Sequence, residues 1–302
     1  MRSVTCNLCG GDDWSVRFPA TDQSDGRLEV AAFRCTHAGY GSHAQIVQCH
    51  ICGFVYSNPR WEDGELLDAY SAVEDDRYVL ERAGRERTFT KHLKALEKYT
   101  GAGNGRRLLD VGAYIGVFVE VAQTNGWDAI GIEPSHWAVE IANSRNIPVI
   151  EGTLGAGELE GEQFDAITLW DVIEHLDDPS AELGKIYTML KPGGVLAVHT
   201  MDINSTTAKV MGSRWPWLMD MHIHYFGRKT LVKMLEKNGF EPVWIGAQSR
   251  FLSLGYIASR IAGISQPVGR SLSWLIGMLG VGEATIPINF GDLMTAFARR
   301  PK

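Results

Sequence analysis

Four cysteines near the N-terminus have the spacing of metal ligands. Cys6 and Cys9 form one Cys-x-x-Cys-Gly motif, and Cys49 and Cys52 form a second. The glycine permits the tight turn that directs two sulfurs at one cation, and four thiolates complete a closed structural zinc site. We therefore predict a structural zinc ion held by these four cysteines. Two unrelated pairs or one redox pair are the alternatives, and Cys35 is left as a buried thiol or a replacement ligand.

A second group of residues has the pattern of a nucleotide site. The apolar segment 106–111 includes Asp110 and is followed by Gly112 and Gly116, and Glu133 ends the next apolar segment. Gly112 lets the backbone approach a ligand closely, and an acid at a strand end accepts hydrogen bonds from ribose hydroxyls. Many nucleotide sites share this pattern. The spacing does not fit G-x-G-x-x-G, which disfavours a nicotinamide-dependent oxidoreductase, and the phosphate-binding loop of ATPases is absent from the sequence.

The elements that would position these residues alternate between strand and helix. The segments expected to be strands are 106–111, 128–132, 147–150, 164–170, 195–200, 240–246 and 293–299. Strands separated by helices indicate a parallel, doubly wound α/β sheet, in which ligands lie beyond the carboxyl ends of the strands. Residues 105–302 are expected to form this domain.

The first 104 residues are expected to form two parts. Residues 1–60 form a small zinc-ribbon module, because a bound ion stabilises a fold whose core is too small to do so alone. Within it, 45–57 has the pattern of a strand, a cysteine knuckle and a second strand. A charged helical linker or cap is expected over 61–104, where the glycines of 101–105 end it.

Four motifs in the α/β domain resemble those of a known enzyme family. They are L-L-D-V-G-A-Y-I-G-V-F from Leu108, G-I-E-P-S from Gly131, F-D-A-I-T-L-W-D-V-I-E-H-L from Phe164 and L-K-P-G-G from Leu190. In this order they resemble class I S-adenosylmethionine-dependent methyltransferases. The resemblance implies an enzyme that uses S-adenosylmethionine, built on a Rossmann-like sheet of seven strands with the last strand antiparallel.

Other motifs resemble a bacterial subgroup of that family. The paired cysteine motifs, W-P-W at 215–217 and H-I-H-Y-F at 222–226 are similar to those of methyltransferases with a zinc-ribbon head, associated with sugar, natural-product or cell-envelope modification. The resemblance implies transfer to a sugar hydroxyl of a small molecule, natural product or lipid-linked glycan. A sugar C- or N-methyltransferase, an RNA methyltransferase and a non-catalytic cofactor-binding scaffold remain alternatives. The net charge of −7 disfavours nucleic acid as a partner.

The same resemblance assigns roles in the cofactor site. Asp110 and Gly112 would line the methionine end, Glu133 would bind the ribose, and Asp171 would face the sulfonium or amino-acid group. Position also assigns Thr153 and Leu154 to the adenine, and a cofactor contact to Gly116. Tyr114 stands where the family usually has glycine, so its side chain would shape the methionine pocket. A helix N-cap is the structural alternative for Asp171.

Three histidines are candidates for removing the proton of the acceptor. Methyl transfer needs alignment and a base, and histidine suits that role near pH 7. His222 is the first candidate, because it lies in a region rich in Trp, Met and His where the acceptor segments of the family occur. His175 belongs to the D-V-I-E-H run and is expected to be structural, and His224 alternates with His222 on an extended segment. Packing is the alternative role for His222.

The stretch 251–282 is apolar and contains Arg260 and Arg270 but no acidic residue. Pro267 is expected to divide it into two short amphipathic helices. Three interpretations are open: a lid on the sheet, a homodimer interface, and a lip that contacts a membrane or a lipid-linked acceptor. The sequence starts without a secretory signal and has no long apolar run, so we expect a cytoplasmic protein, peripheral at the inner membrane face under the third interpretation.

Overall fold

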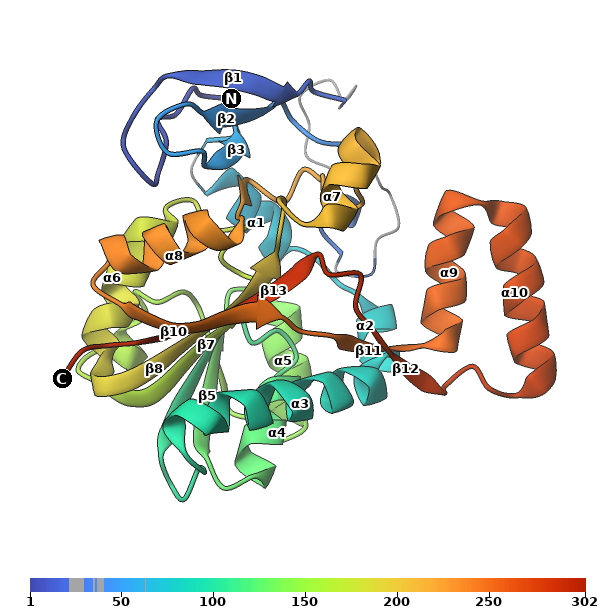
Figure 1. The fold of residues 1–302 in the computed structure, drawn as a ribbon. Helices are drawn as coiled ribbons and strands as arrows, with labels where there is room; N and C mark the ends of the chain where they lie inside the picture. The colour runs from blue at the N-terminus through green and yellow to red at the C-terminus, as the bar shows by residue number, and fades with distance from the viewer. Residues whose placement is uncertain (22–29, 35, 37–40, 63) are drawn as a thin grey trace.

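The computed structural model describes residues 1–21, 30–34, 36, 41–62 and 64–302, and Cys35 lies outside the described residues. A seven-stranded sheet with helices on both faces forms the body (Figure 1). A smaller sheet at the N-terminus lies at one end of the body, and a helical hairpin projects to one side (Figure 1).

The central sheet has the strand order β10-β13-β8-β7-β4-β5-β6. β13 pairs antiparallel with both β8 and β10, whereas the other neighbours are parallel. The strands are β4 (Arg107–Val111), β5 (Asp128–Glu133), β6 (Val149–Glu151), β7 (Phe164–Trp170), β8 (Leu190–Met201), β10 (Glu241–Ala247) and β13 (Leu293–Arg299). The expected α/β fold with an antiparallel last strand is confirmed.

The largest difference from the expected strand boundaries is at the start of β8, and the other boundaries agree within two residues. β8 begins at Leu190, directly after α6 (Pro179–Met189), so the Lys-Pro-Gly-Gly segment continues the strand instead of preceding it. Backbone hydrogen bonds explain this: the Gly193 N–H donates to the Arg300 carbonyl, and the Arg300 N–H donates to the Gly194 carbonyl, both at 2.9 Å. The C-terminal end of the chain therefore extends the strand by pairing with it.

Alternate side chains on the strands build a core on each face of the sheet. Leu109 and Ile167 share a cluster with residues of α6 and α8 (Arg228–Lys237), while Leu108 and Ala166 share another with residues of α3 and α4. Figure 1 shows the helices α3, α4 and α5 on one face and α6 and α8 on the other. Three of these helices are α3 (Arg82–Thr100), α4 (Val117–Thr124) and α5 (His136–Ser144).

The N-terminal sheet takes one of its strands from the α/β domain. β1 (Trp14–Phe18), β2 (Ile46–Cys49) and β3 (Val55–Ser57) pair antiparallel, and β9 (His224–Tyr225) joins the free edge of β3. The expected pattern of strand, knuckle and strand over 45–57 is confirmed. The pairing with β9 fixes the N-terminal sheet against the segment that carries His222.

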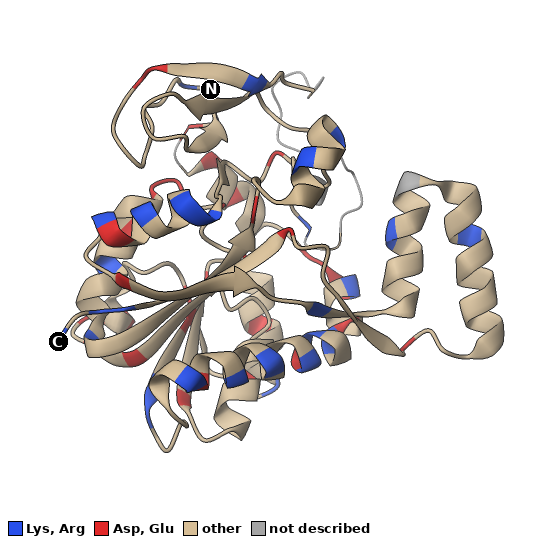
Figure 2. Ribbon diagram, in the orientation of Figure 1, with Lys and Arg blue, Asp and Glu red and all other residues tan. Residues whose placement is uncertain are grey.

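Short helices complete the chain between these parts. α1, α2 and α3 lead from the N-terminal sheet to the body, and Lys and Arg positions, blue in Figure 2, are spread along α3. The remaining helices outside the projecting hairpin are α1 (Glu65–Ser71), α2 (Asp76–Leu80), α7 (Thr206–Met211) and the 3-10 turns at Val30–Phe33, Gly157–Leu159 and Gly212–Arg214.

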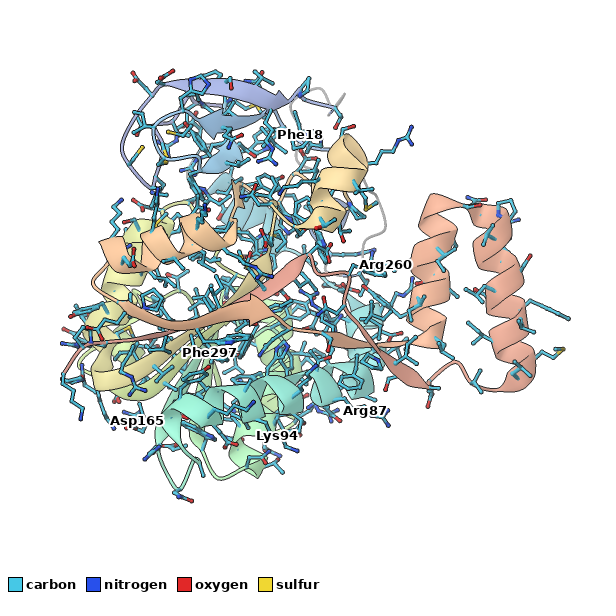
Figure 3. The ribbon with its side chains drawn as sticks, in the orientation of Figure 1. Phe18, Arg87, Lys94, Asp165, Arg260 and Phe297 are labelled. Atoms are coloured by element: carbon cyan, nitrogen blue, oxygen red, sulfur yellow. The ribbon has the colours of Figure 1, made fainter. Side chains whose placement is uncertain are left out.

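A helical hairpin is inserted between β10 and β13. Its helices α9 (Leu254–Ile264) and α10 (Gln266–Leu279) stand on a stem formed by β11 (Arg250–Ser253) and β12 (Thr285–Ile288). The two expected helices are present, with Pro267 in the first turn of α10. A Cβ at Gly269 would lie 2.3 Å from the Cβ of Ala262, so glycine is what permits the close approach of the helices. Arg87 of α3 donates to Thr285 on the stem and holds it to the body (Figure 3).

Among the described residues, no helix combines the length and the apolar character needed to cross a membrane.

Candidate functional site

The four predicted zinc ligands lie together. One sulfur from each of Cys6, Cys9, Cys49 and Cys52 lies within 4.8 Å of the others, and none of these cysteines is in a disulfide. The Cys6 and Cys52 sulfurs are 3.4 Å apart, and the Cys9 and Cys49 sulfurs are 3.6 Å apart. Sulfurs on a tetrahedral zinc, with bonds of about 2.3 Å, are separated by similar distances. The geometry therefore fits one Zn²⁺ ion.

The loop of the first cysteine knuckle is fastened to the α/β domain. The Asn7 side chain donates to the Asp178 carboxylate at 2.7 Å and accepts from the Ser180 N–H at 3.1 Å. Lys237 donates to the Asn7 backbone carbonyl at 2.7 Å. The cysteine cluster is thus held against the ends of α6 and α8 as well as through β9.

The glycine turn after β4 is compact and strained for any other residue. Gly112 and Gly116 have φ angles of 69° and 73°. A Cβ on Gly112 would lie 2.6 Å from Val172, and one on Gly116 would lie 2.6 Å from Ile147. Because Val172 follows β7, the turn after β4 touches the loop after β7, and the two loops together form the carboxyl edge of the sheet.

Two buried carboxyl groups lie beside this turn. Asp110 is 3% exposed and accepts a hydrogen bond from the Thr168 hydroxyl at 2.6 Å. Burial raises the pKa of Asp110 to about 8, while the hydrogen bond from Thr168 opposes the shift. Burial also raises the pKa of Glu133 to about 7, against the hydrogen bonds that it accepts from the N–H groups of Ser135 and Tyr114, each at 2.9 Å.

Tyr114 forms one wall of this region. Its φ angle of 50° lies in the left-handed region that favours glycine, and its side chain is buried. The ring centroid lies 4.4 Å from that of Tyr78 on α2 and 5.9 Å from that of Trp137 on α5. Tyr70 of α1 hydrogen-bonds to the Glu133 carboxyl. The helices α1 and α2 therefore cover the turn after β4, which the sequence pattern did not reveal.

The residues predicted near the adenine follow β6. Thr153 is exposed, whereas Leu154 is buried in the core cluster that also contains Ile132 and Leu169. The structure thus places both residues at the carboxyl end of the strand next to Glu133.

Asp171 ends β7 and is bound to a residue far along the chain. Its Oδ1 lies 2.6 Å from Nη2 of Arg250, the first residue of the hairpin stem. The Arg250 guanidinium also lies 5.4 Å from the ring centroid of Trp217. The N-cap alternative for Asp171 is wrong, because the helix that follows is capped by Asp178. Sequence analysis missed Arg250, since no local pattern links it to Asp171.

His175 and His222 lie next to each other near the same edge, with ring centroids 4.8 Å apart and ring planes tilted by 56°. His175 Nδ1 lies 2.8 Å from the Met221 carbonyl oxygen, and His222 Nδ1 lies 2.8 Å from the Trp217 carbonyl oxygen. Because a carbonyl only accepts, each Nδ1 carries a proton and each Nε2 keeps its lone pair in the neutral ring. Burial lowers the pKa of both histidines, and that of His222 falls well below its usual value.

His224 is separated from this pair. Its ring stacks on Phe54 with centroids 5.6 Å apart, and its Nε2 lies 3.4 Å from the Arg60 guanidinium. Burial, followed by the positive charge of Arg60, lowers the pKa of His224 to about 3. His222 and His224 therefore belong to different surroundings, as the alternation along an extended segment indicates.

A family profile described as a methyltransferase domain matches residues 80–244, more than half of the chain. The match includes the glycine turn, Glu133, Asp171 and both paired histidines. The chain belongs to this methyltransferase family.

Curated relatives agree with that assignment to the family. A ubiquinone biosynthesis O-methyltransferase of Rhodopseudomonas palustris is 28% identical over 165 residues, which are 47% of this chain and 64% of that protein. One of the same description from Cereibacter sphaeroides is 30% identical over 46% of this chain and 62% of its own length. The match thus spans less than two thirds of these relatives.

A solved structure shows the same fold. A SAM-dependent methyltransferase from Archaeoglobus fulgidus is 18% identical in sequence, and its structure matches 74% of this chain and 100% of that chain with a TM-score of 0.50.

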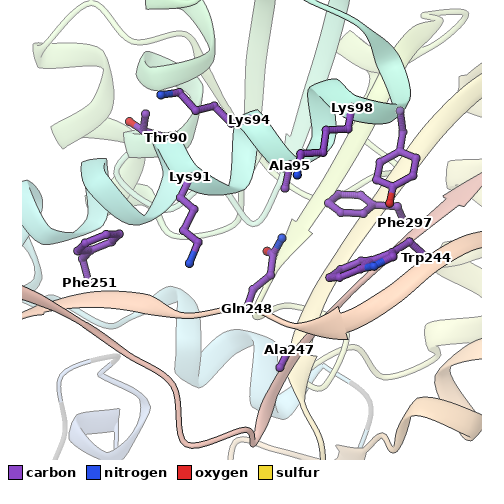
Figure 4. A pocket seen from close by; sticks show the side chains of 11 residues that line it. Thr90, Lys91, Lys94, Ala95, Lys98, Trp244, Ala247, Gln248, Phe251 and Phe297 are labelled. Carbon is purple, nitrogen blue, oxygen red and sulfur yellow. The ribbon is translucent and has the colours of Figure 1, made fainter.

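A separate hollow lies between α3 and β10. It has a volume of about 540 Å³ and is lined by Lys91, Lys94 and Lys98 of α3 and by Trp244 and Phe297 of the sheet (Figure 4). None of the residues predicted for the cofactor or the base lines it.

Proposed function

We propose that this protein transfers a methyl group from S-adenosylmethionine to a hydroxyl oxygen of a small-molecule acceptor. The observation that carries the proposal is the pair of neutral imidazoles, His175 and His222, at the carboxyl edge of the sheet near Asp171. Ligands of doubly wound sheets bind at this edge. The glycine turn after β4 touches the loop after β7, so cofactor and acceptor would lie side by side.

The residues around the glycine turn fit S-adenosylmethionine. The Glu133 oxygens accept the backbone N–H groups of Tyr114 and Ser135 and a hydrogen bond from Tyr70, which leaves one of the four lone pairs of the carboxylate for a ribose hydroxyl. The bound cofactor supplies an electrophilic methyl group on a sulfonium. Asp110 and Gly112 would hold its methionine end, and Asp171 would face the sulfonium or the amino-acid group. We assign the remaining contacts to Tyr114, Gly116, Thr153 and Leu154.

The neutral histidines would receive the proton of the acceptor. His222 is the first candidate because its Nδ1 proton is held by the Trp217 carbonyl, which leaves Nε2 free to accept. His175 lies close enough to share this task. His224 is assigned to packing, since Phe54 and Arg60 surround it.

The acceptor is proposed to present a hydroxyl group. The names of the relatives, ubiquinone biosynthesis O-methyltransferases, support transfer to oxygen. A sugar hydroxyl rests only on the likeness of the N-terminal motifs to sugar-modifying enzymes, so sugar and ubiquinone-type acceptors are separate arms of the test.

The hairpin supports an acceptor with an apolar tail. Trp274 and Met278 of α10 are 69% and 61% exposed, and Arg260 and Arg270 are the charged residues of the two helices. An apolar face with basic residues suits contact with anionic lipid. We therefore propose peripheral membrane contact through α10 in preference to a homodimer through the same face.

The N-terminal segment is proposed to bind one structural zinc ion through its four cysteines. Its sheet ends on β9, next to His222, and Ser57 N–H donates to the Ile223 carbonyl at 2.9 Å. The zinc module of 1–60 would thus position the acceptor side of the 105–302 domain, with 61–104 covering the cofactor.

The proposal is tested by calorimetric titration of the purified chain with S-adenosylhomocysteine, with NADH as control, followed by methyl-transfer assays on sugar and phenolic acceptors. Micromolar binding of the first ligand and none of the second is expected. His222→Ala should lower turnover by about 100-fold or more without weakening S-adenosylhomocysteine binding. His136→Ala, at an exposed histidine of α5, is the control. Absence of binding, or unchanged turnover in His222→Ala, would contradict the proposal.

A further inference from the structure

Glu174 is a buried acid with one oxygen unsatisfied, next to the paired histidines. Its Oε2 accepts from the Thr200 hydroxyl at 2.9 Å, whereas Oε1 has no hydrogen-bond partner among the described residues. The side chain is fully buried. An unpaired carboxyl oxygen in the interior is costly, so its retention needs a ligand or a function.

The three side chains converge on one point. One ligand atom from each of Glu174, His175 and His222 lies within 4.8 Å of the other two. No hydrogen bond joins Glu174 Oε1 to either imidazole, so the cluster is not closed by its own members. Two nitrogens and one carboxylate oxygen around an open point are the donor set of divalent transition-metal sites.

The histidines are oriented as metal ligands are. Each Nδ1–H is held by a backbone carbonyl, that of Met221 for His175 and that of Trp217 for His222. Such outer hydrogen bonds fix the tautomer and aim the Nε2 lone pair at an ion. The N–H groups of Ile223 and His224 donate to the Glu174 backbone carbonyl at 3.0 and 3.1 Å, which locks the His222 segment onto the acid.

The charges around the cluster leave a place for a cation. Asp171 is already paired with Arg250 at 2.6 Å, so it is not free to neutralise an ion. Glu174, whose Oε1 has no hydrogen-bond partner among the described residues, supplies the negative charge of the cluster.

We propose that Glu174, His175 and His222 bind a divalent transition-metal ion on the acceptor side of the site. Three ligands from the protein leave coordination positions for acceptor oxygens, so the preferred acceptor carries a second oxygen next to the hydroxyl that is methylated. This role in the reaction rests on the proposed function, whereas binding of the ion does not.

The ion would promote proton loss from the acceptor. The acceptor O–H bond breaks and its proton passes to water. The oxygen lone pair then forms the O–CH₃ bond as the S–CH₃ bond breaks, and neutral S-adenosylhomocysteine leaves. In this mechanism His222 is a metal ligand and not the base. The Nε2 lone pair that would otherwise accept the proton binds the ion.

The experiment uses the full chain with its cysteine site loaded with zinc, titrated with Mn²⁺ alone and followed by the electron paramagnetic resonance signal of free Mn²⁺. Mn²⁺ prefers oxygen and imidazole ligands to thiolates, so the cysteine cluster does not compete. We expect one bound Mn²⁺ per chain. Glu174→Gln, which keeps the Thr200 hydrogen bond, should weaken the binding of Mn²⁺ by about 100-fold or more.

The control is His136→Asn. His136 lies 2.8 Å from Glu151 and 3.2 Å from Glu140, so these three residues form an exposed cluster of the same residue types. Loss of Mn²⁺ binding in this variant, or no binding to the unmodified chain, would overturn the proposal. Should Glu174→Gln not fold, His222→Gln replaces it, with the same expected loss.

S-adenosylhomocysteine titration of the same samples separates the two proposals. Binding of S-adenosylhomocysteine without Mn²⁺ binding overturns the metal site and leaves the methyltransferase intact. Binding of Mn²⁺ without S-adenosylhomocysteine supports the metal site and counts against the proposed function.

Discussion

Replacing Glu133 by glutamine should weaken the binding of S-adenosylhomocysteine while leaving the chain folded. The carboxyl group of Glu133 is fully buried and accepts the N–H groups of Tyr114 and Ser135, each at 2.9 Å. Glutamine has the same shape but only one acceptor oxygen. The substitution therefore changes hydrogen bonding without opening a cavity.

Glu133→Gln has two free-energy effects, one on the stability of the fold and one on the affinity for the ligand. The glutamine NH₂ faces one of the two backbone N–H groups and leaves it unpaired, which costs about 1–3 kcal/mol of stability. That cost is present with and without ligand. The ribose loses a hydrogen bond to a charged group, about 1.5–3 kcal/mol. Since about 1.4 kcal/mol is tenfold in affinity, the dissociation constant should rise about 10- to 150-fold.

The assay is calorimetric titration with S-adenosylhomocysteine, together with thermal unfolding of the same samples. Glu151→Gln is the matched control, because Glu151 ends the neighbouring strand β6 and its side chain is exposed. A dissociation constant within about twofold of the unmodified chain, in a variant that unfolds normally, would refute the assignment of Glu133 to the ribose.

The dependence on pH gives a second check on Glu133. Its pKa in the folded chain is raised to about 7, above the value of about 4.5 in the unfolded chain. The raised pKa contributes stability that is fully present below about 4.5 and is lost as the pH rises through about 7. Glu133→Gln should remove that slope. Affinity for S-adenosylhomocysteine in the unmodified chain should rise over the same range, because ribose is best bound by the ionised carboxylate.

Two further predictions concern the ends of the chain. Cys49→Ser should abolish zinc binding, measured by metal analysis. It should lower turnover more than S-adenosylhomocysteine binding, because β3 holds β9 beside His222. A loss of about 3 kcal/mol in the free energy of unfolding would lower the unfolding midpoint by about 6–12 °C. Unchanged metal content would refute the zinc assignment. Sedimentation with anionic vesicles should pellet the intact protein and should pellet less of the Trp274→Glu variant. The control Val210→Glu, at a site on α7 that is 81% exposed and outside the hairpin, should pellet as much as the intact protein. No pelleting of the intact protein would exclude the membrane contact.

The strands of the central sheet and the glycine turn could be predicted from sequence because their signals are local. Hydrophobic runs of strand length alternate with helical segments along the chain, and Gly112 and Gly116 stand where φ is positive. The paired cysteine motifs were also predictable, because each Cys-x-x-Cys-Gly turn is formed by consecutive residues. The boundary of β8 was misplaced because its first residues pair with distant segments, Leu190 with Phe164 of β7 and Gly193 with Arg300.

The acceptor side could not be predicted in the same way. Arg250 reaches Asp171 across 79 residues, and β9 joins a sheet whose other strands precede residue 58. Glu174 belongs to the same D-V-I-E-H run as His175, yet its unpaired oxygen becomes visible only when Thr200 and the His222 segment pack around it.

The sequence by itself determined the family, the order of strands and helices, the glycine turn and the two cysteine motifs, because these depend on neighbours along the chain. Tertiary structure decided which histidine faces which partner and where Arg250 and Glu174 stand. It also decided that the cysteine module supports the segment of His222. These contacts join segments whose spacing in sequence carries no signal, and they form only when burial of the two cores brings the distant loops to one edge of the sheet.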